Sequence, residues 1–455
     1  MDDFLSAELR CPYCGGLFKR SNGRQARAAE AYDVLACYCG RYPVVAGIPI
    51  LKKGRISATG QTADEMVHLI EAGSQSVALQ GMLMPAAPPS PAFAPIQLQS
   101  LPSIKGIRWL KSTAHRHALR RWQQQATAFL ANLNERTTAR DMLDFYFRRS
   151  RSPMAHAYDY FALRFGQPRH VVALSFADLI HQPSKPILEL ACGFGHITRS
   201  VIRQAGSQPV IGLDHTFFAL YVAKNWIAPQ AQYVCCEADA GLPFPADAFS
   251  NTLCVDGIHC FANKVTVIRE LKRVTQNDGL MMLVASRNAL VAHPYSGQPL
   301  PPQGYDALLS DTPHRLVSDH EVLARYFQKQ GPPLARSSSA ESLAQAPLLS
   351  ILASQRQEVF QDHGAFEDWP HAHGRLQLNP LYVRDGQDRN GSIHLRRAFP
   401  SVFYEEENAE CKQYLPEDVS VGSQVWLDLE RGRRTPEMER LIERCVVLGM
   451  PERYG

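Results

Sequence analysis

Short apolar runs alternate with segments of helical periodicity between residues 183 and 290. The apolar runs end in polar or glycine residues and read KPILELACGFG, PVIGLDHT, AQYVCCEADA, SNTLCVDGIHC and GLMMLVASRN. Between them lie HITRSVIRQAG, FFALYVAKNWIA and NKVTVIRELKRVT, which separate the runs as helices would. This alternation predicts a parallel sheet with right-handed crossovers, the doubly wound α/β class.

The segment before the first strand has helical spacing. One apolar stripe is formed by Leu119, Trp122, Ala126, Phe129 and Leu133, and shorter helices are expected at 154–166 and 170–180. We interpret residues 114–182 as a helical lead-in that covers the core as a lid. Residues 56–113 are predicted to be a Pro-rich linker, because the stretch PAAPPSPAFAPIQLQSLP cannot sustain a helix.

After residue 290 the alternation weakens. A helix is predicted in SDHEVLARYFQKQG, where Ser318 and Glu321 have capping-box spacing. The segment LQLNPLYVRDGQDRNGSIHLRRAF predicts strand, turn and strand. A last helix should begin at Thr435-Pro436 and stop near Gly449. Residues 291–455 are therefore expected to form an α+β extension, either a substrate cap, a partner surface or a core of its own.

Composition narrows the class of protein. Apolar residues make up 45% of the 455 residues and charged residues 20%, which excludes a wholly disordered, collagen-like or coiled-coil chain. The net charge is 48 − 44 = +4, too small to indicate nucleic acid by itself. No apolar run approaches the roughly 18 residues of a membrane helix, and MDDFLSAELR lacks the apolar region of a signal peptide. Eleven cysteines then indicate a reducing compartment, and we expect a cytoplasmic protein that makes no membrane contact.

Four cysteines near the N-terminus have metal-ligand spacing. Cys11 and Cys14 form C-x-x-C, and Cys37 and Cys39 form C-x-C. Two such loops can supply the four thiolates of a structural Zn²⁺ site, which leaves no open position for a substrate. Free thiols are the alternative, since the second loop is one residue short. The pattern CPYCGG … CYCGRYPVVAGIPIL resembles the small zinc-ribbon subunits that partner methyltransferases, so residues 1–55 are expected to be a zinc-ribbon-like domain.

The segment ILELACGFGHITRSVI ends a strand in a glycine turn and opens a helix. Such a turn brings backbone N–H groups close to a ligand. The third glycine of G-x-G-x-x-G is missing and Glu189 precedes the turn, which argues against a dinucleotide loop. Asp214, at the end of the next strand, can accept hydrogen bonds from both hydroxyls of a ribose. A degenerate core that binds nothing, or another nucleotide, is the alternative.

Here the chain resembles the class I S-adenosylmethionine-dependent methyltransferases, especially the ubiquinone-biosynthesis-like branch. The resemblance covers roughly residues 183–286 and rests on ELACGFG, Asp214, Asp239-Ala240, LPFPADAFSNTLCVDGIHCF and RELKRVTQNDGLMMLV. It implies a Rossmann-like methyltransferase sheet over 183–290 that binds S-adenosylmethionine.

The resemblance also implies roles for single residues. Gly193 and Gly195 should lie under the methionine moiety, with Glu189 holding the loop. Asp214 should bind the ribose, with His215 beside it, while Asp239 and Ala240 should contact the adenine. The remaining cofactor-site positions are Ala191, which replaces a common glycine, Cys192 in the same loop, and Asp256, which should face the substrate.

A general base is needed only when the methyl acceptor must lose a proton. His259, beyond the fourth strand, and Tyr160, on the lead-in, are our candidate catalytic residues; a loop-packing histidine and a tyrosine of the lid are the alternatives. Cys192 and the other cysteines of the core strands are better explained as buried apolar residues than as nucleophiles.

Three functions remain open. The first is an enzyme that methylates a small metabolite, a natural-product intermediate or a sugar conjugate, with the long C-terminal region supplying a pocket. The second is an rRNA or tRNA base methyltransferase that uses the zinc ribbon to recognise RNA; the +4 charge and the sequence DGIH at the fourth strand argue against it. The third is a zinc-ribbon partner subunit without activity. A homodimer stays open as an assembly.

Overall fold

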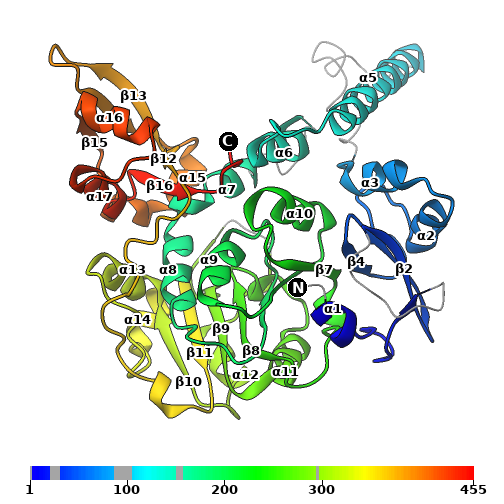
Figure 1. Cartoon of the computed structure of the whole chain (residues 1–455), viewed down its shortest axis with the longest axis horizontal. Coiled ribbons are helices and arrows are strands. Elements are labelled where there is room, and N and C mark those ends of the chain that lie inside the picture. The colour runs from blue at the N-terminus through cyan, green and yellow to red at the C-terminus, as the bar shows by residue number, and fades with distance from the viewer. Residues whose placement is uncertain (1–2, 21–30, 87–104, 150–156, 294–296) are drawn as a thin grey trace.

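A computed structural model describes residues 3–20, 31–86, 105–149, 157–293 and 297–455 (Figure 1). Its largest feature is a sheet with the strand order β1-β2-β3-β4-β7-β6-β5-β8-β9-β11-β10. The five strands predicted from the alternation lie side by side and parallel: β5 (Ile187–Leu190), β6 (Val210–Asp214), β7 (Gln232–Cys236), β8 (Phe249–Val255) and β9 (Thr275–Arg287). The doubly wound α/β class is confirmed.

Helices cover both faces of this sheet, as the burial of every residue in β5, β6 and β8 requires. Ile187 packs on one face, while Leu188 and Leu190 pack on the other. The first face is covered by α8 (Pro168–Ala177), α9 (His196–Gln204), α10 (Phe217–Val222) and α13 (Asp319–Phe327). The second is covered by α1 (Asp3–Glu8), α11 (Lys264–Val274), α12 (Pro302–Leu308) and α14 (Ala340–Gln345).

The sheet runs past residue 290, where we expected the core to end. β11 (Leu348–Ala353) pairs antiparallel with β9, and β10 (His314–Ser318) pairs antiparallel with β11. These strands follow long connections, so they lack the regular spacing that marks the parallel strands along the sequence. The predicted cap at Ser318 is present, since its side chain accepts a hydrogen bond from the N–H of Glu321.

The N-terminal strands extend the same sheet at its other end. They are β1 (Lys19–Arg20), β2 (Tyr32–Cys37), β3 (Gly40–Val45) and β4 (Ile48–Leu51). β4 pairs parallel with β7 through Ile50 and Leu51. The cysteine-bearing segment is therefore part of the same sheet as the core strands and not a separate structural unit.

The predicted linker contains folded structure. α2 (Ala63–Glu71) begins with a capping box formed by Thr62 and Glu65, and it packs against β2 and β3. α3 (Gln75–Leu83) follows it. Both helices are short and lie next to the Pro-rich stretch, whose composition led to the prediction of a linker. Most of that stretch lies outside the described residues.

The lead-in is a series of helices, as predicted, with a break that the sequence did not indicate. α5 (Lys105–Ala131) ends before a turn, and α6 (Ala139–Leu143), the π-helix η2 (Asp144–Arg149) and α7 (Ala157–Ala162) follow. The 3-10 helix η3 (Arg164–Gly166) then leads into α8. In Figure 1 α7 and α8 lie between the sheet and the C-terminal region.

The C-terminal region holds two small sheets. β12 (Arg375–Leu378) pairs with β16 (Val447–Met450), while β13 (Tyr382–Gln387), β14 (Ile393–Arg397) and β15 (Asp418–Val421) form the other, which confirms the predicted strand, turn and strand. Its helices are α15 (Val402–Glu407), α16 (Ser423–Glu430) and α17 (Pro436–Glu443). The prediction that the last helix continues to near Gly449 is wrong, because that residue lies in β16.

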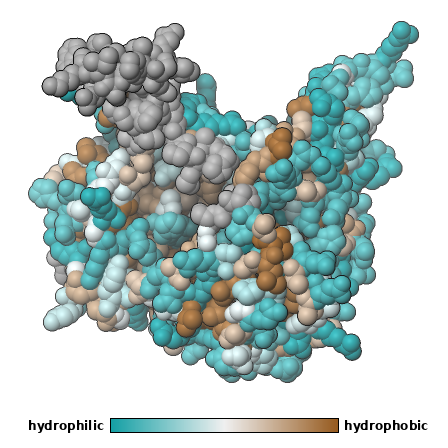
Figure 2. Space-filling model, turned by 180° about the vertical axis from the view of Figure 1, so that it is seen from behind, coloured by the Kyte–Doolittle hydropathy of each residue, from teal (hydrophilic) through white to brown (hydrophobic). Residues whose placement is uncertain are grey.

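The surface seen from behind is mostly hydrophilic, with apolar side chains in separate patches (Figure 2). Among the described residues, no helix is both long and apolar enough to cross a membrane.

Candidate active site

The loop from β5 to α9 is built from residues in the left-handed backbone region. Ala191, Gly193 and Gly195 have φ angles of 57°, 52° and 77°, a conformation that glycine adopts most readily. A Cβ on Gly195 would lie 2.9 Å from the Cβ of Ala223, so a side chain there would push α9 away from its neighbour. A Cβ on Gly193 would meet nothing within 4 Å. Open space therefore lies over the loop, at the amino end of α9.

Asp214 anchors this loop from the end of β6. Its Oδ2 accepts a hydrogen bond from the N–H of Gly193 at 3.0 Å, and its Oδ1 accepts one from the N–H of Thr216 at 2.8 Å. Each carboxylate oxygen has a second lone pair, so Asp214 retains acceptor capacity for a ligand. The side chain of His215 is 72% exposed, with Nδ1 3.4 Å from Oδ1 of Asp214. The structure thus brings together Gly193, Asp214 and His215.

Asp239 and Ala240 lie in the 3-10 helix η5 (Ala238–Ala240), directly after β7, and the side chain of Asp239 is exposed. Lys52, the residue after β4, reaches this edge of the sheet. Its Nζ lies 3.0 Å from Oε1 of Glu237 and donates to the backbone oxygen of His215 at 3.2 Å. The N-terminal segment therefore contributes a cation to the strand ends, which no sequence pattern had indicated.

Glu189 and Cys192 point into the protein. The carboxyl of Glu189 accepts a hydrogen bond from the hydroxyl of Thr198, which ties β5 to α9, and burial raises the pKa of Glu189 to about 8. Cys192 is buried, and a Cβ on Gly212 would lie 2.9 Å from its sulfur. Burial raises the pKa of the Cys192 thiol, so this thiol has the properties of a packing residue.

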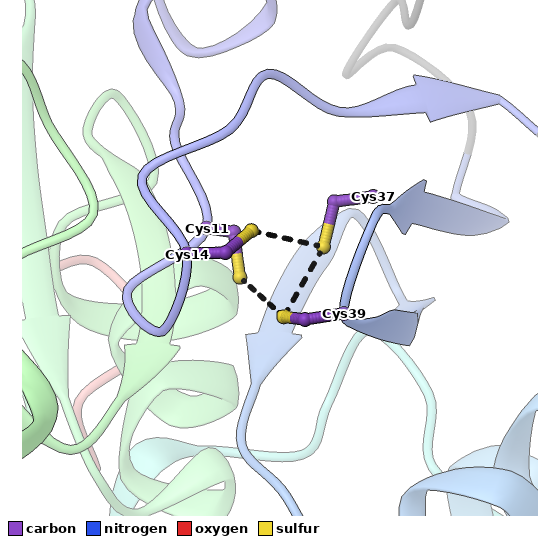
Figure 3. Close-up of side chains that lie close together, drawn as sticks. All are labelled: Cys11, Cys14, Cys37 and Cys39. Atoms are coloured by element: carbon purple, nitrogen blue, oxygen red, sulfur yellow. Dashed lines mark hydrogen bonds between the residues drawn. The ribbon is translucent and has the colours of Figure 1, made fainter.

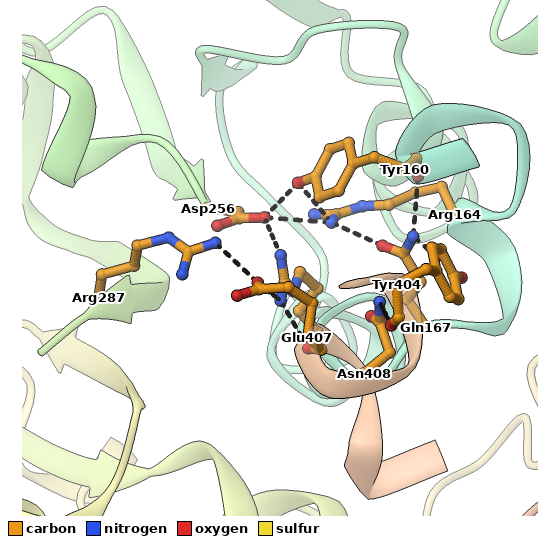
Figure 4. Close-up of polar contacts among 9 residues, drawn as sticks. Tyr160, Arg164, Gln167, Asp256, Arg287, Tyr404, Glu407 and Asn408 are labelled. Atoms are coloured by element: carbon orange, nitrogen blue, oxygen red, sulfur yellow. Dashed lines mark hydrogen bonds and ion pairs between the residues drawn. The ribbon is translucent and has the colours of Figure 1, made fainter. Parts of the chain in front are cut away.

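A buried network of charged side chains lies at the ends of β8 and β9 (Figure 4). Its centre is Asp256, which has a φ of 53° and whose side chain is 5% exposed. Oδ2 of Asp256 accepts a hydrogen bond from the hydroxyl of Tyr160, and lies 3.1 Å from Arg164 and 3.4 Å from Arg169. The two guanidinium groups outweigh the effect of burial and hold the pKa of Asp256 well below its usual range. Asp256 is therefore a carboxylate fixed by residues of the lead-in.

The C-terminal region enters the same network through Glu407, the last residue of α15. Its Oε2 lies 3.4 Å from Nη2 of Arg169 and 3.3 Å from Nη2 of Arg287, which ends β9. Sequence reasoning missed Arg164, Arg169, Arg287 and Glu407 as site residues. The only available signal was the presence of two arginines inside apolar lead-in helices, where a charge must find a partner.

The two catalytic candidates differ in their surroundings. Tyr160 is buried, and this burial raises its pKa well above the usual range, so it remains a hydrogen-bond donor to Asp256. His259 is 4% exposed, and burial lowers its pKa to about 4. Its Nδ1 has no hydrogen-bond partner among the described residues. His259 is thus a neutral imidazole whose buried Nδ1 has no partner among the described residues.

The four N-terminal cysteines form a cluster (Figure 3). Their sulfur atoms all lie within 4.8 Å of one another, with separations of 3.4 Å for Cys11–Cys39, 3.7 Å for Cys14–Cys37 and 3.6 Å for Cys37–Cys39. A Zn–S bond of about 2.3 Å places tetrahedral thiolates about 3.8 Å apart. The donor set and its spacing fit a closed metal site.

The sheet order, with antiparallel β11 between β9 and β10, is that of a class I methyltransferase. S-adenosylmethionine fits the residues at the ends of its parallel strands, because open space lies over Gly193 and Asp214 keeps lone pairs for ribose hydroxyls. Residues 187–279 match the family model described as a methyltransferase domain. The protein is therefore an enzyme of this class, a class I S-adenosylmethionine-dependent methyltransferase.

Three of the solved structures that are similar to this chain are methyltransferases or proteins of known source. The plantazolicin methyltransferase BpumL, in complex with a plantazolicin analogue and S-adenosylhomocysteine, is 16% identical; the match covers 48% of this chain and 95% of that chain, with a TM-score of 0.34. YcgJ of Bacillus subtilis is 16% identical over 40% of this chain and 98% of that chain, with a TM-score of 0.30. A SAM-dependent methyltransferase of Aquifex aeolicus is 12% identical over 38% and 82%, with a TM-score of 0.28. No curated protein matches the sequence.

Proposed function

We propose that this enzyme methylates a small-molecule acceptor. The observation that carries the proposal is the enclosure of the strand ends beside the cofactor loop. Asp256 and Arg287 are covered there by Tyr160, Arg164 and Arg169 of the lead-in and by Glu407 of the C-terminal region, and all six side chains are buried or nearly so. An enclosed site suits an acceptor that is enclosed whole, whereas a flipped RNA base also needs an opening through which the attached polynucleotide leaves the pocket.

The proposal includes the cofactor roles that the resemblance implies, which the hydrogen bond from Gly193 to Asp214 supports. Asp214 accepts the ribose hydroxyls while it holds the loop through Gly193, and the exposed Asp239 and neighbouring Ala240 contact the adenine. When bound, S-adenosylmethionine supplies an electrophilic methyl group on a sulfonium. Alignment and exclusion of water then carry much of the rate, and the buried network around Asp256 supplies both.

We assign proton removal from the acceptor to His259. With a pKa of about 4 the imidazole is unprotonated at neutral pH, and Nδ1, which has no hydrogen-bond partner among the described residues, would be the atom that accepts the proton. Tyr160 acts as a positioning residue, because its hydroxyl is committed to Asp256.

The N-terminal segment, residues 1–55, is proposed to be a zinc-ribbon domain that holds one structural Zn²⁺ through Cys11, Cys14, Cys37 and Cys39. Continuity of β4 with β7 and the contact of Lys52 with Glu237 support a role in shaping the cofactor edge. Membership of the ubiquinone-biosynthesis-like branch is part of the same proposal and rests on the motifs of residues 183–286.

The test is methyl transfer from radiolabelled S-adenosylmethionine into fractionated lysate of the native host. RNA, protein and small-molecule pools are counted separately, with Asp214→Asn as the matched inactive control. Label that enters the small-molecule pool with the native enzyme only supports the proposal and delivers the acceptor for identification. Label in RNA instead would overturn the acceptor class and make the zinc ribbon a candidate for RNA recognition.

A further inference from the structure

A polar cavity lies between the core and the C-terminal region, on the face covered by α8 and α9. It has a volume of about 40 Å³. Helices α8 and α9 form one side of it, and residues 370–373 with β16 form the other. Its polar lining consists of His170, Arg199, Ser200, Arg203, His371 and His373, together with Tyr326. None of these residues belongs to the proposed cofactor, acceptor or zinc sites.

Two arginines line the cavity, and none of its lining residues is acidic. Arg199 donates to the backbone oxygen of Gly449 at 3.2 Å and to that of His373 at 2.6 Å. Among the described residues, no carboxylate lies within 4.0 Å of the Arg199 guanidinium. Burial and the neighbouring Arg203 lower the pKa of Arg199 to about 10, so it stays charged at neutral pH. Arg199 is partly buried, and the charge of Glu452 acts on it without a contact within 4.0 Å, so an anion in the cavity would supply the direct ionic partner that Arg199 lacks.

The other lining groups complete a set of donors. Nδ1 of His170, a residue 3% exposed, has no hydrogen-bond partner among the described residues. Ser200 adds a hydroxyl from the same helix as Arg199. Arg203 is half exposed and lies 3.1 Å from Asp368, which also lies 2.6 Å from Nε2 of His373. Asp368 is thus shared by two basic groups. Asp178 lies 3.5 Å from Nε2 of His371, and neither acid forms an ion pair with Arg199 among the described residues.

We propose that this cavity binds a small oxyanion of the phosphate class. One water needs roughly 10–15 Å³ of such a cavity, so about 40 Å³ has room for about three waters or for one tetrahedral anion. The guanidinium of Arg199 faces one side of the anion, and the imidazole of His170 and the hydroxyl of Ser200 donate from the others. The anion would join α8 and α9 to β16, and so fasten the C-terminal region to the core independently of methyl transfer.

Binding is measured on the full chain by isothermal calorimetry with inorganic phosphate, and by thermal unfolding in phosphate against chloride at equal ionic strength. We expect one saturable site and a rise in melting temperature with phosphate only. Arg199→Gln should weaken binding at least tenfold, roughly, through loss of a charge-assisted bond. The exposed Arg396→Gln, which removes the same charge from a surface pair with Asp385, should bind as the native chain does.

Arg199 also holds two backbone oxygens, so its variant can fail to fold. His170→Phe serves then as the second variant, because it keeps a ring against Phe165 and removes only the donor; affinity should fall about fivefold. Glycerol 3-phosphate, titrated in parallel, distinguishes the source of the anion. Binding of inorganic phosphate alone supports a site for the free ion, and binding of both supports a site for a phosphate carried by an organic molecule. Absence of saturable binding by either, or native affinity in a folded His170→Phe chain, would overturn the proposal.

Discussion

Replacement of Asp214 by asparagine should abolish useful cofactor affinity while leaving the fold in place. Asp214 is 8% exposed, and its two oxygens accept the N–H groups of Gly193 and Thr216. Asparagine has the same size but offers one acceptor oxygen and one NH₂ group. One of the two backbone contacts must therefore be lost, and one ribose hydroxyl meets a donor where it needs a charged acceptor.

The magnitude follows from the number of bonds affected. A hydrogen bond to a charged group contributes about 1.5–3 kcal/mol. Loss of the charge weakens both ribose contacts, so the binding free energy should fall by about 3–6 kcal/mol, roughly a factor of 10²–10⁴ in Kd. Asp214→Ala, which removes both acceptors and both loop anchors, should be at least as severe.

The assay is isothermal calorimetry with S-adenosylhomocysteine, and thermal unfolding of the ligand-free chain controls for the fold. Asp385→Asn is a matched control, since this exposed acid of β13 forms an ion pair with Arg396 of β14, away from the cofactor loop. It should bind S-adenosylhomocysteine as the native chain does. A folded Asp214→Asn chain with affinity within threefold, roughly, of the native value would refute the ribose assignment.

Three further predictions concern the base, the metal and a buried acid. His259→Gln should lower kcat about 10²-fold or more without changing S-adenosylhomocysteine affinity, and the native rate should not titrate through His259 above pH 5, because its pKa is about 4. Metal analysis should find about one zinc per chain. Cys14→Ser or a chelator should remove the zinc, and folded structure should be lost with it. A metal-free chain that is fully folded would contradict the zinc-ribbon proposal. Burial raises the pKa of Asp319 from 3.8 to about 7, so the folded state binds a proton that the unfolded state lacks, and stability falls as pH rises from about 4 to 7. The free energy of unfolding of Asp319→Asn, relative to that of the native chain, should therefore rise by about 2–3 kcal/mol from pH 5 to pH 8. A difference that does not change with pH would contradict the raised pKa.

The parallel strands could be predicted because their sequences obey local rules. Each is an apolar run buried on both faces and followed by a polar or glycine residue, as in Ile187–Leu190 before the loop at Ala191. The ends of such strands meet at one edge of the sheet, so Gly193 and Asp214 could be placed near each other from sequence alone, and their hydrogen bond is present.

Other parts of the fold escaped prediction for identifiable reasons. β10 and β11 follow long connections that contain α12, α13 and α14, so the regular spacing of strands and helices over residues 183–290 does not extend to them. α2 is nine residues long, and its stability depends on the capping box of Thr62 and on packing against the ribbon strands. The composition of the neighbouring Pro-rich stretch outweighed that local signal.

The acceptor side of the site depends on contacts that no local rule describes. Arg164 and Asp256 are 92 positions apart, and Arg169 and Glu407 are 238 positions apart. Each of these charges is buried, so each must be paired, but the sequence does not state with which partner. Asp256 also sits in a left-handed conformation at the end of β8, as does Ala191 at the end of neighbouring β5. Strain at two adjacent strand ends is maintained only where surrounding contacts hold it, and here the arginines of the lead-in supply those contacts. The same contacts that hide the acceptor side from sequence analysis are thus the ones that keep Asp256 in place beside the cofactor loop.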